Sequence, residues 1–270
     1  NPATIGIAVL RLDSVGELLW QTAIDGPGSD YVFSIAEVPN GGYIVGGETS
    51  SFGAGERDLW MTRLDATGGV IWQKTYGGPG QDLARGVLPT PDGGFVAAGY
   101  GGQGVFVLKT DASGNIMWQK LYRATMTDLS SIQTTSDGGY IFNGKINGRW
   151  TIVKLTSSGS IAWQKTYGDA QRYGSIAQTA DGGYVASMNV ADASGGLEFA
   201  LLRLDSNGNK IWQRSYGGPL YDEVCYPYCL QEAQDGNILV AGFTESFGTG
   251  GGSGWTNMDA WVLRVFSDGS

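Results

Sequence analysis

The chain of 270 residues contains no histidine, only two cysteines and only eight prolines. Without histidine, a Ser-His-Asp or Cys-His catalytic arrangement and a histidine-ligated metal are excluded, and so is the commonest general base. No apolar run reaches the ~18 residues that a membrane-spanning helix needs. Any catalysis would therefore depend on carboxylates, and we expect no membrane insertion.

Positive charge is also scarce. The 17 Lys and Arg residues are outnumbered by 26 Asp and Glu residues, which gives a net charge of −9. Nucleic acids and anionic membranes reward the opposite balance, so we exclude both as main partners. The chain opens at Asn1 without a charged and apolar targeting segment, as expected of a mature exported protein or a piece of a longer surface protein. We expect a secreted or cell-surface location.

The two cysteines stand close together in Cys225-Tyr-Pro-Tyr-Cys229. Two thiols are too few for a structural zinc site, and the spacing differs from the Cys-x-x-Cys redox motif. The pattern therefore predicts a local disulfide between Cys225 and Cys229. We predict no metal site and no cofactor.

The chain is rich in glycine (45), tyrosine (13) and tryptophan (9), and it repeats itself. Five tryptophans, at positions 20, 72, 118, 163 and 212, are separated by 52, 46, 45 and 49 residues. A second marker, an Asn or Asp before Gly at positions 40, 92, 137, 181 and 235, keeps nearly the same spacing. Two markers with one period indicate a repeat architecture.

Each repeat predicts four short strands. An Asp-Gly-Gly turn joins strand A to strand B, and an Asp-x-x-Gly turn joins strand C to strand D, which carries the tryptophan. Such four-stranded antiparallel sheets must stack on one another, which predicts an all-β fold: a β-propeller forming a single domain over residues 1–270. Six C-type strands, five D-type strands and five A/B hairpins favour five blades, with six blades, one incomplete, as the alternative.

The strand order and the tryptophan strand resemble the quinoprotein (PQQ-like) propeller blade with its tryptophan-docking repeat. The Trp-Gln-Lys-Thr-Tyr-Gly-Gly segment at 72–78 is more closely similar to repeats of bacterial and archaeal cell-surface and secreted propeller proteins. This resemblance covers nearly the whole chain. It implies a propeller in an extracellular setting, with no catalytic residues to transfer and no quinone cofactor.

Basic residues recur on the predicted C strands, among them Arg63, Lys109 and Arg203. We expect these side chains to form cross-strand and inter-blade ion pairs with nearby acids, such as Asp65 and Asp111, rather than a ring of anion-binding sites.

Four aspartates stand at the predicted start of strand A: Asp30, Asp82, Asp128 and Asp222. Because they recur in the repeat, we expect them to cap the preceding loop by hydrogen bonds to its amides. In the alternative interpretation they are channel carboxylates of a glycosidase or lyase, whose two carboxyl groups would stand ~5 to ~9.5 Å apart.

Departures from the repeat are the better guide to binding, because loops tolerate change where they carry function. The last repeat has the insertion that contains Tyr226 and Tyr228, and a glycine-rich loop that contains Trp255. We favour a non-catalytic extracellular module for binding a protein partner or for self-assembly. The alternative is a carbohydrate-binding propeller that uses Trp255, Tyr226 and Tyr228 or pockets between blades; a glycosidase or lyase ranks third.

Overall fold

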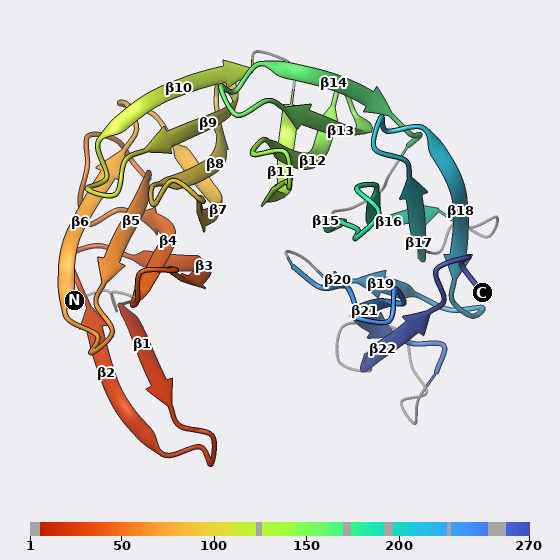
Figure 1. The fold of residues 1–270 in the computed structure, drawn as a ribbon, viewed down its shortest axis with the longest axis horizontal. Helices are drawn as coiled ribbons and strands as arrows, with labels where there is room; N and C mark the ends of the chain where they lie inside the picture. Colours follow the sequence, from red (N-terminus) through yellow and green to blue (C-terminus); the bar gives the residue numbers. More distant parts are fainter. Residues whose placement is uncertain (1–5, 123–125, 170–173, 192–196, 226–227, 248–257) are drawn as a thin grey trace. The chain divides into compact units, whose positions relative to one another are not determined.

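The computed structural model describes residues 6–122, 126–169, 174–191, 197–225, 228–247 and 258–270. It divides into two compact units, unit 1 (Asn1–Met126) and unit 2 (Thr127–Ser270). Both units consist of antiparallel sheets, shown in Figure 1, and in all but the last sheet consecutive strands are neighbours. This is the blade architecture of an all-β propeller, as predicted.

Unit 1 holds a two-stranded sheet, β1-β2, followed by two four-stranded sheets, β3-β4-β5-β6 and β7-β8-β9-β10. Its strands are β1 (Ile7–Leu12), β2 (Leu18–Ile24), β3 (Asp30–Glu37), β4 (Tyr43–Thr49), β5 (Asp58–Leu64), β6 (Val70–Tyr76), β7 (Asp82–Pro89), β8 (Phe95–Gly101), β9 (Gly104–Thr110) and β10 (Ile116–Tyr122).

Unit 2 holds two four-stranded sheets, β11-β12-β13-β14 and β15-β16-β17-β18, and a last sheet in which β19, β20 and β22 all pair with β21. Its strands are β11 (Met126–Thr134), β12 (Tyr140–Ile146), β13 (Arg149–Leu155), β14 (Ile161–Thr166), β15 (Ile176–Gln178), β16 (Tyr184–Ala191), β17 (Leu197–Leu204), β18 (Lys210–Tyr216), β19 (Asp222–Val224), β20 (Leu230–Glu232), β21 (Ile238–Thr244) and β22 (Asp259–Val265).

The predicted strand count is confirmed over the part of the chain that the structure describes. The strands form six sheets: four have all of strands A to D, β1-β2 supplies only C and D, and the last sheet supplies A, B and C with A split into β19 and β20. Because two of the six sheets are incomplete, the sheets correspond to five or six blades, as the sequence predicts.

The hairpin turns form as their residues dictate. In the turn between β7 and β8, Gly93 has φ +82°, a backbone conformation that side chains disfavour, and its N–H donates to the Thr90 carbonyl (2.9 Å). At Gly94 a Cβ atom would lie 2.1 Å from the Thr110 carbonyl oxygen. Glycine at both positions thus lets the turn close against the neighbouring strand.

Within each unit, D-strand tryptophans and tyrosines dock onto the C–D turn of the next sheet. In unit 1, Trp72 Nε1 donates to the Ala112 carbonyl (3.0 Å), and the Tyr76 hydroxyl donates to the Gly114 carbonyl (2.7 Å). Equivalent bonds are Trp20 to Ala66, Tyr167 to Gly208, Trp212 to Ser267 and Tyr216 to Gly269. The recurring tryptophans and tyrosines thus join one repeat to the next.

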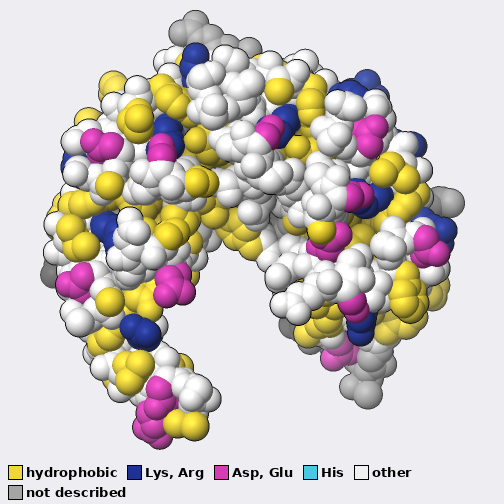
Figure 2. All heavy atoms as spheres, viewed as in Figure 1, with side chains coloured by type: hydrophobic (Ala, Val, Ile, Leu, Met, Phe, Trp, Pro, Cys, Tyr) yellow, Lys and Arg dark blue, Asp and Glu magenta, His cyan; other side chains and the backbone are white. Residues whose placement is uncertain are grey.

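The C-strand cations form ion pairs, but their partners differ from those we expected. Lys109 pairs with Asp92 (2.9 Å), and Arg203 pairs with Asp181 (2.6 Å). The partner is thus the acid of the A–B turn, not Asp111 or another acid of the C–D turn. The register explains the difference: Lys109 lies opposite Val96, near the start of strand B, so its ammonium reaches back to the turn. Figure 2 shows basic and acidic side chains next to one another on the face that it displays.

The docking bond of Tyr76 can be tested with the Tyr76→Phe variant. It removes the only side-chain donor of the Gly114 carbonyl among the described residues, and we expect the free energy of unfolding to fall by about 1 kcal/mol, measured by urea denaturation. Tyr31 is a matched control, since its hydroxyl forms no hydrogen bond with the described part of the chain. The Tyr31→Phe variant should lose less than about 0.5 kcal/mol. Equal losses would contradict a docking role.

The ion pairs predict acid sensitivity. Partial burial raises the pKa of Asp92, but hydrogen bonds from Thr90, Lys109 and Gly94 outweigh this effect and lower the pKa to about 2. The folded pKa lies below the unfolded value of about 3.9, so the carboxylate stabilises the fold above that pH and loses this contribution as the pH falls through about 2. The Asp92→Asn variant should therefore show a shallower acid decline of stability than the parent chain.

Thermal unfolding followed by circular dichroism across this pH window measures the slope. Asp25 is exposed and belongs to none of the ion pairs among the described residues, so the Asp25→Asn variant should keep the parent slope. An unchanged slope in Asp92→Asn would refute the assignment.

Candidate functional site

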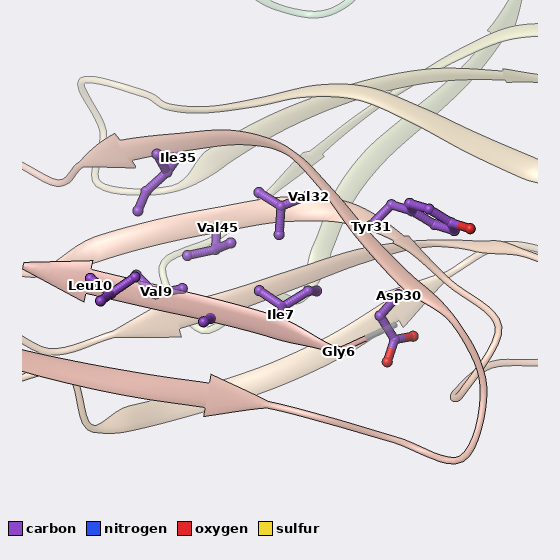
Figure 3. A pocket seen from close by; sticks show the side chains of 10 residues that line it. Gly6, Ile7, Val9, Leu10, Asp30, Tyr31, Val32, Ile35 and Val45 are labelled. Atoms are coloured by element: carbon purple, nitrogen blue, oxygen red, sulfur yellow. The ribbon is translucent and has the colours of Figure 1, made fainter. Parts of the chain in front are cut away.

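An apolar groove lies in unit 1 between β1 and β3. It has a volume of about 440 Å³ and is lined mainly by aliphatic side chains. Figure 3 shows Ile7 and Val9 from β1 and Val32 and Ile35 from β3 around the same space. Among the described strands β1 pairs only with β2, so its other edge, beside the groove, offers unpaired backbone groups.

In the next sheet the equivalent face is covered by other strands. Val32 and Ile35 on β3 are 38% and 54% exposed, whereas Ala84 and Val87, at the same positions of β7, are 1% and 0% exposed. Strands β3 and β4 cover β7: the Ser34 hydroxyl bonds to the backbone of Val87. Among the described strands, the sheet before β3 contains only β1 and β2, so that sheet supplies no A or B strand to cover β3.

A second open edge lies in unit 2. Among the described strands β22 pairs only with β21, whereas β17, the C strand of the preceding sheet, pairs on its far side with the D strand β18. Along β22, Val262 is 72% exposed. One edge therefore lacks a B-type neighbour and the other lacks a D-type neighbour.

Two of the predicted carboxylates are engaged on both oxygens. Asp30, which is 3% exposed, accepts hydrogen bonds from the hydroxyls of Thr49 and Ser51. Asp222, which is fully buried, accepts hydrogen bonds from the hydroxyls of Thr244 and Ser246 and from the Gly218 amide. Carboxylates held in this way brace the end of the A–B hairpin.

The other two predicted carboxylates, Asp82 and Asp128, do not show this pair of hydroxyl bonds in the described part of the chain. Asp82 is half-buried and accepts one hydrogen bond, from the Gly78 amide (2.8 Å). Asp128 lies on β11, and its side chain is outside the described residues.

The insertion of the last repeat splits strand A. Cys225 and Cys229 form a disulfide, with Cα atoms 5.7 Å apart, between β19 and β20. The Tyr228 hydroxyl is buried and has no hydrogen-bond partner among the described residues, and burial raises its pKa. Its hydroxyl therefore does not face solvent as a ligand-binding group would. Tyr226 and Trp255 lie outside the described residues.

Sequence reasoning missed a cluster of charged and aromatic residues in unit 1. Glu48, 5% exposed, accepts a hydrogen bond from Arg57 (3.2 Å), and burial raises the pKa of Glu48. Arg85 on β7 lies over the rings of Phe33 on β3 and Tyr100 on β8, at 5.1 and 4.9 Å. The Arg85 guanidinium lies against a ring from each of two sheets, so the cluster joins these sheets.

Among the described residues, no group of three or more His, Cys, Asp or Glu side chains is placed to hold a metal ion. The same part of the chain contains no helix long and apolar enough to span a membrane.

Solved structures share the fold. A protein of unknown function from Bacteroides caccae is 13% identical with a TM-score of 0.58, and the match covers 98% of this chain and 92% of that one. A protein from Lactobacillus plantarum is 12% identical with a TM-score of 0.58, over 96% of this chain and 77% of that one. A protein of unknown function from Dyadobacter fermentans is 12% identical with a TM-score of 0.51, over 92% and 79%. No family model and no curated protein matches the chain.

The bracing role of Asp30 predicts a loss of stability in the Asp30→Ala variant. Two hydroxyl groups would lose a charged acceptor in a buried position, so the free energy of unfolding should fall by about 2–3 kcal/mol. Asp30→Asn keeps one acceptor and should lose less. Asp25→Ala, at an exposed position of the same connection, is the control and should stay close to the parent. Urea denaturation distinguishes the three; a parent-like Asp30→Ala would exclude the role.

Proposed function

We propose that the chain is a non-catalytic binding and assembly module, and that a second copy of the chain occupies the groove between β1 and β3. One observation carries this proposal: β3 exposes Ile35, whereas the equivalent Val87 is completely covered by strands of the repeat.

The repeat itself indicates what fills the groove. In the next sheet, the equivalent face is covered by an A/B hairpin of the same repeat, with a backbone that comes close: a Cβ atom on Gly46 would lie 2.1 Å from Val87 Cγ2. A second copy offers hairpins of this shape and apolar character. Its B-type strand would also pair with the open edge of β1, which is β-strand addition. The open edge of β22 would take a D-type strand in the same manner.

Other features support the non-catalytic and extracellular parts of the proposal. Asp30 and Asp222 have both oxygens bound by hydroxyl groups, which leaves neither carboxylate available as a nucleophile or general acid. A disulfide within a short insertion favours an oxidising compartment. The similarity of the repeats to those of cell-surface and secreted propeller proteins agrees with this setting.

The Ile35→Lys variant tests the groove. Sedimentation velocity up to millimolar protein should show concentration-dependent association of the parent chain. In Ile35→Lys we expect association to be weaker by at least about tenfold, because an ammonium group would be brought into an apolar contact.

Ile71 is the matched control. It is 56% exposed on β6, close to the 54% of Ile35, and it does not line the groove. The Ile71→Lys variant should associate like the parent. A strictly monomeric parent chain, or equal effects of the two lysines, would reject the second copy as occupant.

A further inference from the structure

A second cavity in unit 1 differs in chemistry from the apolar groove. It lies between the β6–β7 connection, the turn between β8 and β9, and β10. Its volume is about 440 Å³, within the range of about 300–1,000 Å³ that is typical of small-molecule sites. Its lining is rich in glycine and includes three glutamines and one carboxylate.

The cavity lies beside Asp82, which lacks the two hydroxyl donors that bind Asp30 and Asp222. Asp30 is paired in register with Thr49, and Asp222 with Thr244, and in both sheets a serine two residues later completes the pair of hydroxyl donors. Asp82 is instead paired with Gly101, which has no side chain. The residue two positions later is Gln103, in a turn of only two residues between β8 and β9.

The Asp82 carboxylate therefore keeps hydrogen-bonding capacity that its counterparts have used. The Gly78 amide donates to Oδ2, and no other donor from the described residues bonds to this carboxylate. Oδ1 lies 3.2 Å from the position that a Cβ atom on Gly101 would take, where the counterparts have a threonine. A half-buried carboxylate oxygen facing a cavity is an acceptor for ligand hydroxyls.

The rest of the lining adds neutral donors and acceptors. Gln103 and Gln119 are exposed, and each amide can donate two hydrogen bonds and accept two. Gln81 donates through Nε2 to Glu56 (2.8 Å), which leaves its amide oxygen as an acceptor. Leu121, 39% exposed, contributes an apolar surface.

The charge of the site selects against anions. Asp82 is the only charged residue among those that line the cavity, which contain no Lys or Arg. A sugar ring carries hydroxyl groups that can bond to the carboxylate and the amides, and an apolar face that can pack on the leucine side chain. Asp82 would repel an anionic ligand.

We propose that this cavity binds a neutral saccharide of one or two rings, with Asp82 accepting hydrogen bonds from its hydroxyls and with Gln103 and Gln119 at its rim. This binding site is separate from the assembly groove between β1 and β3. The site binds and does not cleave, because it contains one carboxylate where hydrolysis uses two.

The test is titration calorimetry with a panel of neutral mono- and disaccharides of glucose, galactose, mannose and xylose, with galacturonate and digalacturonate as anionic comparisons. We expect at least one neutral sugar to bind and the two uronates not to bind. The Gln103→Ala and Gln119→Ala variants should each weaken binding by about tenfold, since each removes hydrogen bonds made at the rim.

Gln213→Ala is the matched control. Gln213 occupies on β18 the repeat position that Gln119 occupies on β10, and it is exposed but does not line the cavity. It should bind sugar like the parent. The proposal fails if none of the neutral sugars binds at tens of millimolar, if only the uronates bind, or if the Gln103 and Gln119 variants bind like Gln213→Ala. Sedimentation of the same variants keeps this result separate from the assembly proposal.

Discussion

The donation from a D-strand tryptophan or tyrosine to the carbonyl of the next C–D turn is the contact on which the rest of each unit depends. A sheet of this repeat has apolar residues on both faces and cannot bury them alone. The Trp72 and Tyr76 bonds set the distance and the register at which one sheet meets the next, and the core between them closes over Phe95 and Leu108. The cores between neighbouring sheets follow from this spacing.

Much of this fold could be predicted from the sequence because its signals are local and repeated. Asp-Gly-Gly predicts a tight turn wherever it stands, as at Gly93, and the tryptophan period reveals the repeat even where individual strands are ambiguous. The partner of Lys109 was predicted wrongly because the choice between Asp92 and Asp111 depends on strand register and not on closeness in sequence.

The two proposed binding surfaces could not be predicted in this way. In the sequence, Val32 and Ile35 look like apolar strand residues that would be buried. Their exposure depends on which strands the preceding sheet contains. For Asp82 the signal is present in the sequence, as glycine and glutamine where the repeats of Asp30 and Asp222 have threonine and serine. It becomes visible only once strand pairing shows that Gly101 lies opposite Asp82.

The short turn between β8 and β9 has a consequence for how such a protein can diversify. In the sheet β3–β6 the connection between strands B and C is longer, and its first residues, Ser50 and Ser51, pack against Gly26 and Gly28 of the preceding connection. In the sheet β7–β10 this connection has only two residues, and the cavity lies beside it while the strands keep the pairing of the sheet β3–β6. New specificities can therefore arise in this scaffold by insertion and deletion at one position of the repeat, independently in each copy, without remodelling the core.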